Sequence, residues 1–115
     1  MKYLLMFCTA PEDKTRWNAM SQAELGQLFA RVETWQEANA SRISFRGYRL
    51  QGPDAATTVR HIQSGKPLVT DGPFVEAHEV ISGFLIAEVT DLDEALAMAK
   101  SFPACSTCEI RPVLE

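Results

Sequence analysis

Apolar residues along this chain follow two kinds of pattern, which together predict a mixed α+β fold. Runs rich in apolar and β-branched residues, without helical spacing, are typical of β-strands. They cover residues 2–8, 44–51, 57–62, 80–89 and 107–113. In the strands at 2–8 and 80–89, apolar residues occupy both alternating faces except at Ser82 and Glu88. These two strands are therefore expected to be covered on both sides of their sheet.

Two other segments carry apolar residues at the spacing of an amphipathic helix. The first covers roughly residues 21–41. It opens on a capping box, in which Ser21 accepts a hydrogen bond from the Glu24 amide and the Glu24 carboxylate reaches back. The second begins after Asp91, which caps the first turn, and is stopped by Pro103. The chain is therefore predicted to contain two helices.

A surface loop and a hairpin turn are predicted between these elements. Residues 9–19 hold Pro11 and four charged side chains, which favours a surface loop. Leu68 and Val69 lead into a turn at residues 71–73, whose sequence is Asp-Gly-Pro. In such a turn Asp bonds the downstream backbone, Gly permits positive φ and Pro fixes φ.

The element order is strand, helix, strand, hairpin region, strand, helix, strand, which predicts a ferredoxin-like α+β protomer with an antiparallel sheet. Two helices can cover only one face of such a sheet, yet the strands at 2–8 and 80–89 are apolar on both faces. A second copy of the chain is the economical cover for the other face. We therefore predict a homodimer whose sheets pack face to face or close into a shared α+β barrel, with pockets near the seam.

Length and charge narrow the class of protein further. The 115 residues form a single domain, 1–115, large enough for one hydrophobic core. The net charge of −4 gives no support for a nucleic-acid partner. The apolar run at 3–8 is too short to span a membrane and lacks the features of a targeting segment. A cytoplasmic protein with no membrane partner is expected.

The three cysteines do not form a recognisable cofactor motif. Cys105 and Cys108 have C-x-x-C spacing, but no second pair of ligands accompanies them at zinc-binding spacing. The pair also follows a helix, whereas a thioredoxin-like centre lies at a helix N-terminus. We predict incidental cysteines and no metal site. No Gly-rich phosphate-binding loop is present, so no organic cofactor is implied.

The stretch Thr70–Glu79 carries the most chemistry. Asp71 at the turn could act as a base or orient an imidazole, or could simply bond its own turn. In an extended segment Glu76 and His78 share one face, so the carboxylate could raise the imidazole pKa for acid–base work. The alternative is a lone surface histidine. Asp71, His78 and Glu76 are the predicted catalytic residues.

A second group is predicted to bind substrate: Arg49, Arg60, His61 and Phe74. Arginines on neighbouring strands could hold an anionic carboxylate through two hydrogen bonds. Arg46 and Arg49 alternate to opposite faces of a regular strand, so at most two of the three arginines could converge. A solvated basic patch and a packed histidine are the alternatives.

The ordered motifs resemble one known family. Thr57-Thr58-Val59-Arg60, then Leu68 to Phe74 with its Asp-Gly-Pro-Phe signature, and finally Glu109 to Val113 are similar to the YCII-related (DGPF) domain family. The resemblance covers the whole chain and implies a dimeric α+β barrel. Where the family usually has Lys, this chain has His78, so a fixed cation is replaced by an imidazole that titrates near pH ~6.5.

What the resemblance implies about function is limited. Most members are uncharacterised, and the wider superfamily includes muconolactone-isomerase-like enzymes and a dehydrochlorinase. One hypothesis is therefore a lyase- or isomerase-like acid–base step on a small molecule bound at the dimer seam. The alternative is a non-catalytic module that binds a ligand or partner in regulation. Convergence of Asp71 and a histidine in one dry pocket would favour the enzyme, and exposure to bulk solvent would favour the binding module.

Overall fold

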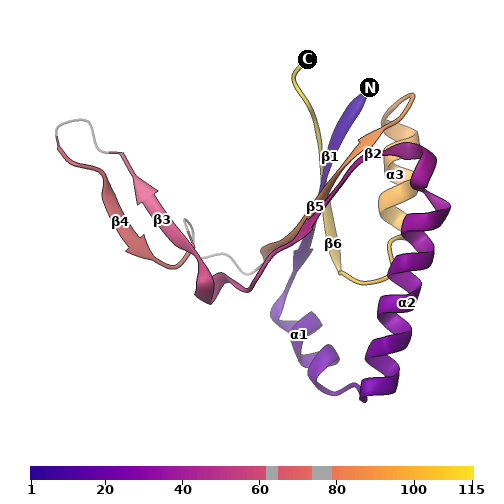
Figure 1. Ribbon diagram of the computed structural model, residues 1–115, viewed down its shortest axis with the longest axis horizontal. Helices are drawn as coiled ribbons and strands as arrows, with labels where there is room; N and C mark the ends of the chain where they lie inside the picture. The colour runs from indigo at the N-terminus through magenta and orange to yellow at the C-terminus, as the bar shows by residue number, and fades with distance from the viewer. Residues whose placement is uncertain (62–64, 74–78) are drawn as a thin grey trace.

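The computed structural model describes residues 1–61, 65–73 and 79–115. The elements are β1 (Lys2–Thr9), α1 (Pro11–Asn18), α2 (Gln22–Ala38), β2 (Ile43–Arg49), β3 (Thr57–Arg60), β4 (Leu68–Asp71), β5 (Val80–Glu88), α3 (Leu92–Ser101) and β6 (Thr107–Pro112). Strands β2, β5, β1 and β6 form an antiparallel sheet in that order, while β3 and β4 form a separate two-stranded sheet. Helices α2 and α3 lie together on one side of the larger sheet (Figure 1). This arrangement confirms the predicted ferredoxin-like α+β fold.

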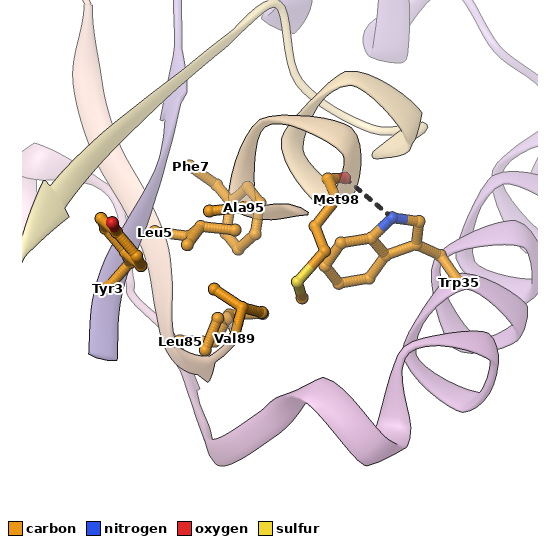
Figure 2. Packing of buried hydrophobic residues seen from close by; sticks show 9 residues of the cluster. Tyr3, Leu5, Phe7, Trp35, Leu85, Val89, Ala95 and Met98 are labelled. Carbon is orange, nitrogen blue, oxygen red and sulfur yellow. Dashed lines mark hydrogen bonds between the residues drawn. The ribbon is translucent and has the colours of Figure 1, made fainter. Parts of the chain in front are cut away.

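The core lies between the sheet and these two helices. Tyr3, Leu5 and Phe7 alternate along β1 and pack with Leu85 of β5 and with residues of α2 and α3 (Figure 2). Fully burying a side chain of this size contributes roughly 1.5–3 kcal/mol. The Trp35 indole N–H donates to the Met98 carbonyl at 3.1 Å, which ties α2 to α3 inside the core. This side of the sheet is called the helix-covered face.

Both predicted helix caps are present. The Glu24 amide donates to Ser21 Oγ at 3.1 Å, and the Ser21 amide donates to the Glu24 carboxylate at 3.1 Å. The Glu94 amide donates to Asp91 Oδ1 at 3.0 Å at the start of α3. Helix α2 ends at Ala38 rather than at residue 41, because residues 40–42 form a short 3₁₀ turn.

The prediction of a surface loop at residues 9–19 is wrong, because most of that segment forms α1. Pro11 occupies the first turn, where its missing N–H is not needed. The Asp13 carboxylate accepts the Ala10 amide at 2.9 Å, as the N3 residue of a capping box does. Asp13 is only 1% exposed and also accepts from Ser106 Oγ at 2.6 Å. That contact spans 93 residues of sequence, which a local pattern cannot reveal.

The second face of the sheet carries apolar side chains that none of the helices in the described residues covers. It presents Leu4, Met6, Phe45, Tyr48, Phe84 and Ile86 and is called the open face. Three of its rings cluster, with centroids 5.9 to 6.4 Å apart. Phe45 is 43% exposed and Tyr48 is 69% exposed. The sequence pattern therefore correctly identified a sheet that is apolar on both faces.

Strands β3 and β4 form an arm that projects from the rest of the molecule (Figure 1). At its base the Gly72 amide donates to the Ala56 carbonyl at 2.8 Å, and Thr58 Oγ1 donates to the Gly72 carbonyl at 2.6 Å. The radius of gyration is 16.4 Å, whereas a compact chain of this length is expected at about 13 Å. Within the described ranges, no helix is long and apolar enough to cross a membrane.

Candidate functional site

A pocket of about 740 Å³ lies on the helix-covered side of the sheet. Its wall is built from the end of β1, from α1 and α2, from the end of β2 with the residues that follow it, from residues 80–85 of β5 and from residues that follow α3. Tyr48 and Phe84 of the open face also contribute to its lining. The volume lies within the range of about 300–1,000 Å³ that is usual for small-molecule sites. We call it the helix-side pocket. It is formed within a single chain, and the predicted pockets at a dimer seam stay a prediction.

Aromatic side chains make up much of the wall. The rings of Phe7 and Phe102 stack with centroids 4.1 Å apart, and the Trp35 ring stands edge-on to both, at 6.1 and 5.0 Å. Trp17 of α1 and Phe29 of α2 also line the pocket. Rings packed at these distances form a rigid apolar surface. A ligand can bind against it at little cost in side-chain entropy of the protein.

The charged residues that line the pocket are all cations. They are Lys14, Arg46 and Arg49, which we call the rim cations, and the described lining contains no Asp or Glu. All three are exposed. The guanidinium carbon of Arg49 lies 5.0 Å from the centroid of the Phe29 ring, which is a cation–π distance. The pocket therefore combines an apolar wall with a positive rim.

An irregularity in β2 allows Arg46 and Arg49 to line the same pocket. In a regular strand, residues three apart point to opposite faces. Here the register shifts between Phe45 and Tyr48, and Gly47 between them has φ of +67°. This β-bulge adds a residue, so Arg46 and Arg49 both reach the pocket, contrary to the prediction of opposite faces. A glycine within a strand pattern was the available signal for it.

Helix α1 supplies the other residues that sequence reasoning missed. Lys14 and Trp17 line the pocket from α1, which the sequence pattern had placed in a loop. Asp13 fixes this helix through Ser106, Ala10 and Arg16, whose guanidinium lies 2.6 Å from the carboxylate. Burial alone would raise the pKa of Asp13, but the hydrogen bonds from Ser106 and Ala10 and the charge of Arg16 outweigh burial and lower the pKa.

The predicted site residues fall in different parts of the molecule. Arg49 lines the helix-side pocket, whereas Asp71 is an exposed residue at the base of the arm, paired with Thr57. Arg60 ends β3 and pairs with Leu68 farther along the arm, and the adjacent His61 is exposed. Phe74, Glu76 and His78 lie outside the described residues. Among the described candidates, the structure brings no carboxylate and imidazole together in a pocket.

A second pocket of about 630 Å³ lies at the base of the arm. It shares residues 50–53 and 80–81 with the helix-side pocket, so the two hollows adjoin. Glu79 contributes a carboxylate to it and accepts a hydrogen bond from Thr107 Oγ1 at 3.0 Å, while Asp71 is not among its lining residues. It has no arginine or lysine in its described lining, so its polarity differs from that of the first pocket.

The cysteines show no sign of nucleophilic activation. Burial raises the pKa of Cys105 to about 11 and that of Cys108 to about 12. Burial, together with the charges of Glu79 and Glu109, also raises the pKa of Cys8. The reactive thiolate is therefore disfavoured at neutral pH. Across residues 1–61, 65–73 and 79–115, no three His, Cys, Asp or Glu side chains are grouped so as to hold a metal ion.

Comparisons with known proteins identify a family. A family model described as the YCII-related domain matches residues 1–115, the whole chain. An uncharacterised protein of Rhizobium meliloti (strain 1021) is 39% identical over a stretch that covers 56% of this chain and 55% of the relative. The match thus spans little more than half the length of that relative. Neither description names a ligand or a reaction.

Proposed function

The chain belongs to the YCII-related domain family, and we propose that it is a small-molecule-binding protein whose ligand occupies the helix-side pocket. The observation that carries this proposal is the pocket itself. It has the volume of a ligand site and a wall of packed aromatic rings. Binding there needs no residue of the arm.

Acid–base catalysis has less support than binding. A lyase- or isomerase-like step requires a base and a proton donor that meet at one substrate. Asp71 and His61 are exposed on the arm and do not line either described pocket. This is the outcome that favours a binding module over an enzyme. The predicted roles of His78 and Glu76 concern residues outside the described ranges and stay predictions.

We also propose that the functional unit is a homodimer joined through the open face. Phe45, Tyr48 and Phe84 form an aromatic cluster that the protomer leaves partly exposed. Contiguous exposed apolar surface of this kind is typical of interaction sites. An isologous dimer would bury this face against its own copy, which removes the apolar surface from water on both protomers at once.

A pocket-filling substitution tests the binding site. Val32 of α2 lines the helix-side pocket, whereas Ala30 on the same helix is exposed and does not. Val32→Trp should obstruct the cavity with a bulky side chain and abolish the thermal shift produced by small aromatic alcohols, lactones and acids. Ala30→Trp adds the same side chain outside the pocket and should leave those shifts unchanged.

The two variants must first show the far-UV circular dichroism of the wild type. If the wild type gains no stability from any compound, or if Val32→Trp responds as the wild type does, the ligand does not occupy this pocket and the proposal fails.

A further inference from the structure

We infer that the ligand of the helix-side pocket is an apolar molecule that carries one anionic group, most simply a carboxylate, held by Arg49 at the mouth. This inference rests on the proposed function and adds the chemical class of the ligand. It concerns the charge at the rim, which is a separate observation from the shape and the aromatic wall of the pocket.

The charge of the lining departs from that of the chain. The protein has 15 Asp and Glu against 11 Lys and Arg. If charged residues lined the pocket in the same proportion as they occur in the chain, carboxylates would be at least as frequent there as cations. The described lining has instead three cations and no carboxylate. A cluster of one sign at the mouth of a low-dielectric cavity attracts ligands of the opposite sign.

Three arginines outside the rim form ion pairs, whereas the rim cations form none with the described residues. Arg16 pairs with Asp13 at 2.6 Å, Arg42 with Glu94 at 3.1 Å and Arg111 with Glu109 at 2.6 Å. In the part of the chain that the structure describes, no ion pair joins Lys14, Arg46 or Arg49 to a carboxylate. An incoming anion would therefore not need to displace an internal ion pair in order to bind.

Arg49 is the best placed of the three. Its guanidinium lies over Phe29 of α2, a ring that itself lines the pocket. Stacking on an aromatic face holds a guanidinium in place while its N–H groups remain able to bind both oxygens of a carboxylate. An anion at Arg49 would leave the apolar body of the ligand to contact the aromatic wall. Such a ligand is amphipathic, with its charged end at the rim.

The test separates charge from shape by using matched probes. Isothermal titration calorimetry would compare 1-naphthoate with neutral 1-naphthylmethanol, and decanoate with neutral decanol. Of the two carboxylates, we expect the one that binds more tightly to have a dissociation constant at least about tenfold lower than that of its matched alcohol. The reason is that charge-assisted hydrogen bonds are stronger than neutral ones. Comparing the naphthyl pair with the decyl pair distinguishes an aromatic acid from a fatty acid as the class of ligand.

Two arginine variants assign the effect to the rim. Arg49→Gln should reduce the preference for the carboxylate to less than about threefold and leave the binding of the alcohol nearly unchanged, since only the charge-assisted contact is lost. Arg31→Gln removes an exposed arginine of α2 that does not line the pocket, and it should retain the full preference.

Each result supports or overturns a specific claim. Equal binding of acid and alcohol by the wild type overturns the anion inference but leaves the pocket as a binding site. A carboxylate preference that survives in Arg49→Gln overturns the role of Arg49. If none of the four probes binds, the inference fails together with the proposed function.

Discussion

Asp13 shows how much a single residue contributes to this site. Its carboxylate is almost fully buried and accepts hydrogen bonds from Ala10, Ser106 and Arg16. A buried carboxylate is costly unless it is satisfied in this way. The network anchors α1, and α1 brings Lys14 and Trp17 to the helix-side pocket. The stability of this buried group and the shape of the candidate site are therefore linked.

Asp13→Asn should lower the free energy of unfolding by about 1–3 kcal/mol at neutral pH, because the charged acceptor is lost inside the fold. The pKa of Asp13 is lowered in the folded protein, so its contribution is complete above the unfolded pKa of about 3.9 and is lost as pH falls through the folded value. The unfolding free energies of wild type and variant, from urea titrations, should therefore begin to converge as the pH falls below about 4 and should meet below the folded pKa of Asp13.

Asp54→Asn is the matched control, since Asp54 is exposed near the base of the arm. It should change the free energy of unfolding by less than about 0.5 kcal/mol. A pH-independent loss in Asp13→Asn would contradict the assignment of the effect to the carboxylate charge.

At the scale of elements, the bulge in β2 shapes both faces of the sheet. It lets Phe45 and Tyr48 share the open face, and it lets Arg46 and Arg49 share the helix-side pocket. Gly47 makes this possible, since a Cβ at that position would collide with the Phe84 carbonyl. Its positive φ adds a second requirement for glycine.

Two glycine substitutions should therefore act in opposite directions. Gly47→Ala should destabilise the protein by more than about 2 kcal/mol, because strain at φ > 0 adds to the backbone collision. Gly26 lies inside α2, and a Cβ added there would meet no atom within 4 Å, so Gly26→Ala should stabilise by about 0.5–1 kcal/mol. Thermal or urea unfolding of both variants measures this difference. A neutral Gly47→Ala would show that the bulge does not require glycine.

At the scale of the whole molecule, two exposed apolar surfaces bear on self-association. The open face carries the aromatic cluster, and the arm carries Val59 and Val69, which face each other in register and are 50% and 61% exposed. An isolated two-stranded hairpin is only marginally stable in water. The protomer therefore has features that association with a second copy would stabilise.

Phe45→Lys should weaken self-association through the open face. Phe45 is 43% exposed and is not among the residues lining either described pocket. A lysine there places a charge inside the proposed interface, and the dimer dissociation constant should rise at least about tenfold, as for an interface hot spot. Sedimentation equilibrium measures the change. Leu92→Lys is the control, because Leu92 of α3 is similarly exposed, at 48%, but lies outside the open face. A monomeric wild type would contradict the dimer proposal.

Features that depend on a few neighbouring residues were readable from the sequence. The helix caps at Ser21 and Asp91 and the apolar residues on both faces of β1 and β5 all predicted the observed structure. These interactions join residues close together in the chain, so a pattern of residue types is enough to show them. The ferredoxin-like fold and the apolar second face followed from the same local evidence.

Tertiary structure decided the features that depend on distant residues. Helix α1 is anchored by Ser106, 93 positions from Asp13, and the bulge at Gly47 is fitted against the backbone of β5. Neither contact leaves a periodic signal, and both determine which side chains line the helix-side pocket. The sequence by itself therefore determined the α+β architecture, because local propensity and burial periodicity specify it. The position and the positive rim of the candidate site depend on contacts that exist only once the chain has folded.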